Sequence, residues 1–163
     1  MHPTYLETYV NQLQRPECLL ELDFKNFGGW TLHEYQQEAV INALKAIYAY
    51  THESQNVIAY YNNNLTQQQQ NEIANQNRDV LCPFYGENFN YRAFLNRLSL
   101  WMATGSGKTL VLIKLMECLF HLIQKGHLPE RDFLLMAPKD DILKQIKQHI
   151  KIPIILLTAK GEV

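Results

Sequence analysis

Cysteine is scarce in this sequence, and a stretch long and apolar enough to span a membrane is missing. The three cysteines are widely spaced and form no Cys-x-x-Cys pair, so neither a disulfide framework nor a zinc ribbon is indicated. The longest apolar run, 110–123, is interrupted by Lys114, Glu117 and His121, and the first residues lack a basic segment followed by an apolar one. We therefore expect a cytoplasmic protein that does not insert into a membrane.

Net charge is also low, but it is unevenly distributed. The formal charge is -1, with 47% hydrophobic and 19% charged residues, a composition typical of a folded globular domain. Residues 1–99 carry 6 Lys+Arg against 10 Asp+Glu, whereas residues 100–163 carry 9 against 6. The last third is therefore the basic part of the chain.

The first part of the chain favours helix. A glycine-containing turn at 27–30 precedes a segment, 32–50, in which apolar residues recur at helical spacing. Thr31 followed three residues later by Glu34 has the pattern of a capping box. We predict an amphipathic helix over 32–50 that begins at this box.

A stretch rich in Asn and Gln follows. Between residues 54 and 77, 13 of 24 positions are Asn or Gln, which leaves little apolar surface to bury. We interpret 52–94 as a helical or disordered insertion, which separates an N-terminal region, 1–51, from a C-terminal region, 95–163.

The C-terminal region alternates between two kinds of apolar pattern. We predict strands at 95–102, 133–137 and 152–159, and helices at 109–125 and 140–149. Parallel strands need a connection long enough to return, which a helix provides. The fold class is therefore α/β, a parallel sheet with crossover helices, preceded by a mostly helical N-terminal region.

The segment Met-Ala-Thr-Gly-Ser-Gly-Lys-Thr, residues 102–109, carries the clearest chemistry. Gly105 and Gly107 let the main chain turn tightly and direct N–H groups toward a phosphate. Lys108 is placed to contact the β- and γ-phosphates, and Thr109 offers a hydroxyl to Mg²⁺ at the start of a helix. The alternative is a chance glycine turn, but the apolar segment before it and the helix after it favour a phosphate loop.

This loop, downstream of Leu-His-Glu-Tyr-Gln-Gln-Glu-Ala at 32–39, resembles that of superfamily 2 helicases and translocases. Their first loop glycine is often replaced, as it is here by Met102. The upstream segment is similar to the glutamine motif of type III and type I restriction subunits. The resemblance implies an incomplete RecA-like domain that uses ATP and Mg²⁺. The nucleotide-binding residues it implies are Gln36, Thr104, Gly105, Ser106, Gly107, Lys108 and Thr109, with the Thr109 hydroxyl on the metal.

The same resemblance implies that Gln36 hydrogen-bonds the edge of the adenine base. A carboxamide carries both a donor and an acceptor and can pair with N6 and N7 together. Phe27 and Trp30 are candidates to stack on the base. A solvated helix position is the alternative for Gln36, and a core or hinge position is the alternative for Trp30.

The segment 137–145 resembles motif Ia, which contacts one nucleic-acid strand in that superfamily. On a helix, the side chains of Lys144, Lys147 and Lys151 fall on one side, and Lys139 precedes them. These lysines are candidate DNA-backbone contacts with salt-sensitive binding. An ordinary solvated helix face explains them equally well.

The acidic pair needed for hydrolysis is missing, because no Asp-Glu dipeptide occurs in the sequence. We therefore expect an N-terminal ATP-binding fragment of a DNA helicase or translocase of a restriction-modification system, which by itself does not hydrolyse ATP. Its partners are expected to be DNA and, through the parent protein, a methyltransferase or specificity subunit. The alternatives are a different phosphate-loop NTPase and a vestigial nucleotide-binding fragment without activity.

Overall fold

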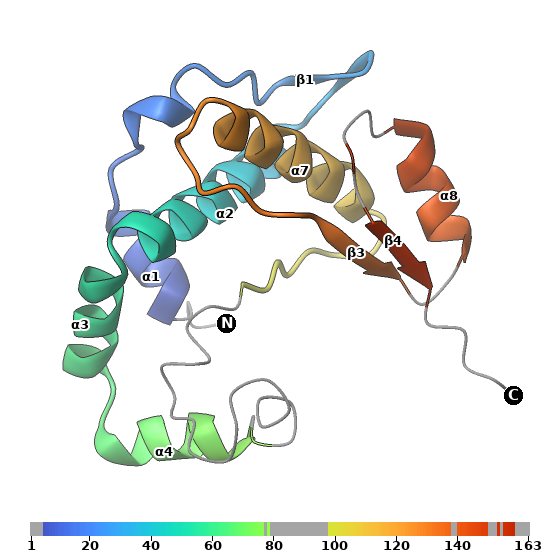
Figure 1. Ribbon diagram of the computed structural model, residues 1–163. Helices are drawn as coiled ribbons and strands as arrows, with labels where there is room; N and C mark the ends of the chain where they lie inside the picture. Colours follow the sequence, from blue (N-terminus) through green and yellow to red (C-terminus); the bar gives the residue numbers. More distant parts are fainter. Residues whose placement is uncertain are drawn as a thin grey trace, which may run out of the picture. The chain divides into compact units, whose positions relative to one another are not determined.

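The computed structural model describes residues 5–76, 78, 98–137, 140–149, 153 and 155–158. The elements in chain order are α1 (Tyr5–Gln12), a short 3-10 helix (Glu17–Leu19), β1 (Asn26–Phe27), β2 (Trp30–Thr31), α2 (Glu34–His52), α3 (Ser54–Asn64), α4 (Gln67–Gln76), α7 (Lys108–Gln124), β3 (Leu134–Ala137), α8 (Asp140–His149) and β4 (Ile155–Thr158) (Figure 1). None of the helices in these ranges combines the length and apolar character needed to cross a membrane.

The chain divides into two compact units, each built from two separate segments. Unit 1 comprises Met1–Gln14 and Lys45–Leu100, and unit 2 comprises Arg15–Leu44 and Trp101–Val163. The division of the sequence into three consecutive regions stays a prediction. The phosphate loop and the glutamine motif both belong to unit 2.

Unit 1 has a core rich in tyrosine. Its buried residues are Tyr9, Ala49, Val57, Tyr61 and Leu65. The rings of Tyr9 and Tyr60 lie with their centroids 4.8 Å apart, a separation at which aromatic pairs attract beyond the area they bury. Burial, followed by the charge of Glu53, raises the pKa of the Tyr9 hydroxyl.

The Asn/Gln-rich stretch forms helices in its described part. Helix α3 contributes Val57 and Tyr61 to the unit 1 core, whereas α4 buries no residue fully. A capping box begins α4, because Thr66 N–H donates to Gln69 Oε1 at 2.9 Å and Gln69 N–H donates to Thr66 Oγ1 at 3.3 Å. The residues from 79 to 97 lie outside the described part of the chain.

From α7 onward, unit 2 alternates between helix and strand as predicted. Helix α7 buries an extensive apolar face, which includes Val111, Ile113 and Leu122. β3 pairs with β4 in parallel, with Leu134 opposite Ile155 and Ala137 opposite Thr158. Helix α8 connects the two strands and packs against both of them and against α7 (Figure 1).

The strand predicted before the phosphate loop is not present in its described residues. Residues 98–103 adopt no strand or helix, and a strand cannot form without a neighbour to which it hydrogen-bonds. The described part of the chain therefore holds only two-stranded sheets, β1–β2 and β3–β4. A wider parallel sheet stays a prediction.

A short antiparallel hairpin precedes α2. Asn26 pairs with Thr31 and Phe27 with Trp30, and the turn between them uses Gly28 and Gly29 at φ 51° and 89°. Two consecutive residues with positive φ make the tight hairpin turn that suits the twist of paired strands. Because Thr31 belongs to β2, it does not cap the helix as predicted.

Candidate functional site

The phosphate loop leads directly into α7. Gly105 and Gly107 have φ values of 80° and 79°, the left-handed region that favours glycine. Ser106 closes the turn, because both its N–H, at 3.3 Å, and its hydroxyl, at 2.7 Å, donate to the Ala103 carbonyl. Gly107 is the N-terminal cap residue of α7 and provides no side-chain cap. The first N–H groups of such a helix have no partner within the helix and can bind an anion.

The Lys108 side chain folds back over this turn. Its ammonium donates to the main-chain carbonyls of Met102, at 2.5 Å, and Ala103, at 2.6 Å. The side chain is exposed, so the charge lies at the surface of the loop. Thr104 is exposed, and Thr109 is half-buried in the first turn of α7.

Gln36 contacts the loop from α2. Its Nε2 donates to the Ser106 carbonyl at 2.9 Å, and its Oε1 accepts a hydrogen bond from the His33 N–H at 2.9 Å. The second bond has the capping-box arrangement, with His33 and Gln36 in the places predicted for Thr31 and Glu34. Gln36 is only 5% exposed, so it is not a solvated helix residue.

Tyr35 is a site residue that the sequence did not reveal. Its hydroxyl donates to the same Ser106 carbonyl at 3.1 Å. The ring is 50% exposed and stacks on His33, with centroids 5.7 Å apart and planes inclined by 9°. The only available signal was its position beside the glutamine.

Of the two aromatic candidates for base stacking, only one is accessible. Phe27 is buried in a cluster with Leu32, Ile113 and Ile146, so its position does not favour stacking on a base. Trp30 is 59% exposed, and the core position considered for it was wrong. An exposed indole at the hairpin offers a free ring face.

The predicted DNA-binding lysines are described only in part. Lys144 and Lys147 are exposed on α8, whereas Ile146 of the same helix is 1% exposed in the cluster with Phe27. This confirms that α8 has a packed side and an exposed basic side. Lys139 and Lys151 lie outside the described residues.

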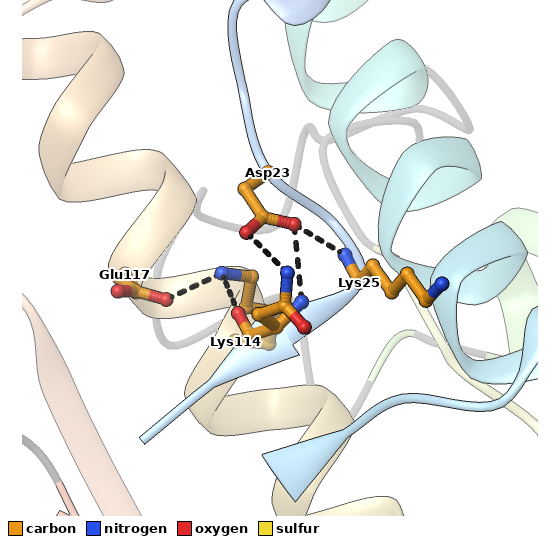
Figure 2. Close-up of polar contacts among 5 residues, drawn as sticks. Asp23, Lys25, Lys114 and Glu117 are labelled. Carbon is orange, nitrogen blue, oxygen red and sulfur yellow. Dashed lines mark hydrogen bonds and ion pairs between the residues drawn. The ribbon is translucent and has the colours of Figure 1, made fainter. Parts of the chain in front are cut away.

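A polar network joins α7 to the segment that precedes β1 (Figure 2). Lys114 is 4% exposed and donates to the Asn26 carbonyl at 2.9 Å and to Glu117 Oε2 at 2.8 Å. The Asp23 carboxylate accepts hydrogen bonds from the N–H groups of Lys25, at 2.8 Å, and Asn26, at 3.0 Å, and from Asn26 Nδ2, at 2.9 Å. The hydrogen bond from the Asn26 side chain, followed by the main-chain donors, lowers the pKa of Asp23.

Other titratable groups do not extend the site. Burial raises the pKa of Cys118, in α7, to about 11, against a smaller lowering by the Lys114 charge. A buried thiol of this kind is chemically inert at neutral pH. Within the described residues there is no group of three or more His, Cys, Asp or Glu side chains that could hold a metal ion.

Comparison with known proteins identifies the family. The model of the family "Type III restriction enzyme, res subunit" matches residues 30–155, which include the hairpin strand β2, the glutamine motif, the phosphate loop and α8. The chain therefore belongs to the type III restriction enzyme res subunit family, a superfamily 2 helicase-like domain. Comparison with curated proteins and with solved structures gives no match.

The family match confirms the resemblance on which the sequence interpretation relied. At the level of the family, it implies a RecA-like fold, ATP and Mg²⁺ as ligands, and interaction with DNA.

Proposed function

We propose that this chain binds Mg·ATP at residues 102–109. The observation that supports this best is the convergence of two side chains on one turn: Lys108 donates to the carbonyls of Met102 and Ala103, and Gln36 donates to that of Ser106. A phosphate is a stronger acceptor for an ammonium than a neutral carbonyl is. Lys108 is thus placed to exchange its carbonyl partners for a nucleotide phosphate.

The remaining loop residues complete the phosphate site. The N–H groups of Gly105, Gly107, Lys108 and Thr109 supply donors, and the positive end of the α7 dipole adds attraction for an anion. We assign the Thr109 hydroxyl to Mg²⁺, which prefers oxygen ligands and keeps several of its waters. Thr104 and Ser106 belong to the same turn and shape it.

We assign the adenine base to Gln36 and Trp30. Gln36 uses one amide hydrogen and one oxygen lone pair within the protein, so one donor and one acceptor remain for a base edge. Trp30 is exposed at the hairpin that leads into α2 and can supply a stacking face.

At the level of the whole protein, we infer an ATP-dependent DNA translocase or helicase of a restriction-modification system. The family match supports this inference. The exposed Lys144 and Lys147 of α8 support backbone contacts to DNA, and we propose that Lys139 and Lys151, which lie outside the described residues, join them. A methyltransferase or specificity subunit as partner stays a prediction. The chain alone is not expected to turn over ATP, because its sequence contains no Asp-Glu pair to hold Mg²⁺ and orient water.

Calorimetric titration with Mg·ATP tests the proposal. The wild-type chain should bind, and Lys108→Ala should weaken binding by about a hundredfold, since it removes charge-assisted hydrogen bonds to phosphate. Lys125→Ala is the matched control, because Lys125 is an exposed lysine at the other end of α7. Equal affinity of the wild type and Lys108→Ala, or no binding by the wild type, would exclude this site.

A further inference from the structure

Lys114 is a charged residue at a position where an apolar one is expected. It lies in the middle of α7 between residues that form the buried face, and only 4% of it is exposed. Burying an ammonium is costly unless hydrogen bonds compensate for the lost water. Glu117 supplies one such bond, but its side chain is 49% exposed and needs no partner in the core.

The other partner of Lys114 shows what the buried charge holds in place. Its Nζ donates at 2.9 Å to the main-chain carbonyl of Asn26, 88 residues earlier in the sequence. The ammonium also lies 5.8 Å from the centre of the Phe27 ring, within the range of a cation–π contact. Lys114 thus contacts both residues of β1.

The segment that Lys114 holds is itself internally braced. Asp23 closes the bend before β1 through three hydrogen bonds to Lys25 and Asn26 (Figure 2). At the same open end of the hairpin, Leu32 N–H donates to the Lys25 carbonyl at 2.8 Å. These hydrogen bonds link the bend and the two strands into one hydrogen-bonded piece, and the Lys114 bond joins that piece to α7.

This piece and α7 carry opposite ends of the proposed nucleotide site. Lys108, in the phosphate loop, precedes Lys114 by six residues, which is roughly 9 Å along a helix. The hairpin carries Trp30 and leads into the first turn of α2, which contains Gln36. One buried hydrogen bond, from Lys114 Nζ to the Asn26 carbonyl, thus helps to fix the distance between the phosphate loop and the residues assigned to the base.

We propose that Lys114 is a positioning residue that sets the affinity of the site for the base and not for the phosphates. The proposal rests on the proposed binding of Mg·ATP at residues 102–109. The polar contacts of Lys114 go to Asn26, Phe27 and Glu117, so we propose that it acts on the site through the hairpin. If Lys114 only stabilised the fold, its loss would lower the affinity for ligands with a base and for ligands without a base to the same extent.

Two probes separate these roles in the full chain: Mg·ATP and Mg·tripolyphosphate, which lacks a base. Lys114→Met keeps an unbranched apolar stem, one atom shorter, and removes the charged donor. It should weaken Mg·ATP binding by up to about tenfold, a limit set by the strength of the charged hydrogen bond that holds the hairpin, and change tripolyphosphate binding less than about twofold. Glu117→Gln leaves the hydrogen bond between Lys114 and Asn26 in place, so it should change both affinities less than about twofold.

A second variant decides the matter if Lys114→Met fails to fold. Asp23→Ala removes the hydrogen bonds that close the exposed bend next to Lys114, and it should also weaken Mg·ATP binding selectively. Equal weakening of both probes, or unchanged Mg·ATP affinity in the folded variants, overturns the role of Lys114 and leaves the ATP site standing. Failure of the wild type to bind either probe overturns both proposals.

Discussion

The amide nitrogen of Gln36 donates a hydrogen bond of 2.9 Å to the main-chain carbonyl of Ser106. Residues 70 positions apart in the sequence thereby join the first turn of α2 to the loop that begins α7. The glutamine is held at its other atom by the His33 N–H, so its orientation is fixed by the protein. A base that pairs with it meets a carboxamide that is already aligned, which lowers the entropic cost of binding.

Gly107→Ala should destabilise the loop for two reasons. The residue has φ +79°, and a Cβ placed there would lie 2.5 Å from Gln36 Nε2. The left-handed conformation alone costs about 1 to 2 kcal/mol for a residue with a Cβ, and displacement of Gln36 adds to it. Urea unfolding should show the loss of stability, and titration with Mg·ATP should show weaker binding.

Gly105→Ala is the matched control for this substitution. Its φ is +80°, but nothing lies within 4 Å of the added Cβ. It should therefore show the conformational cost without the collision. Identical unfolding free energies for the two variants would mean that Gln36 does not restrict position 107.

Gln36→Ala should reduce the preference for ATP over GTP. The change removes the group assigned to the adenine edge, and a site that loses such a hydrogen bond should lose about tenfold in ATP affinity. Competition between ATP and GTP measures the preference directly. The exposed neighbour Glu38 provides the control, because Glu38→Ala should leave the ratio unchanged. An unaltered ratio in Gln36→Ala would remove the adenine assignment.

Replacing Lys144 and Lys147 together by Glu should weaken DNA binding and its dependence on salt. Each phosphate contact contributes about 0.9 to the slope of log K against log salt on duplex DNA, so the slope should fall by about two. The double change of the exposed Lys125 and Arg131 to Glu alters the net charge equally. Equal losses of DNA affinity in the two double variants would indicate a general effect of charge and would contradict a DNA-binding site on α8.

Asp23 should make folding stability depend on acid pH. Hydrogen bonds from the side chain and main chain of Asn26 and from the main chain of Lys25 lower its pKa below the ordinary value of 3.8. The stabilisation is therefore fully present above that value and is lost as the pH falls through the lower pKa of the folded state. The difference in unfolding free energy between wild type and Asp23→Asn, measured in urea, should be constant at about pH 6 and above and should shrink as the pH falls below 3.8. A difference in unfolding free energy that stayed constant down to acid pH would show that the Asp23 charge does not contribute to stability.

Local pattern was enough to predict the elements that have a strong apolar face. The helix predicted over 109–125 is α7 (Lys108–Gln124), and the one predicted over 140–149 is α8. In both, burial of one helix face determines the structure, and the sequence period reports it directly. The start of α2 was misplaced by the Thr31 and Glu34 pattern, because pairing with Asn26 places Thr31 in a strand.

The site was predictable only where a local motif defines it. Glycines followed by lysine identify the phosphate loop, since the chain there must turn tightly and then begin a helix. The bond between Lys114 and Asn26 has no such signature, because its acceptor is a main-chain carbonyl, which every residue carries. The one available sign was a lysine within the apolar pattern of α7. The exposure of Trp30 and the burial of Phe27 likewise depend on tertiary packing.

Helix α4 has no fully buried residue, and Ile73 is its partly buried contact with the core of unit 1. Side-chain pairs four residues apart, such as Gln68 with Glu72, each add only about 0.2 to 0.5 kcal/mol. A helix of this length is marginal without tertiary packing. Its amide hydrogens should consequently exchange with deuterium through local opening, well before those of α7, and a protease should cleave α4 before it cleaves α7.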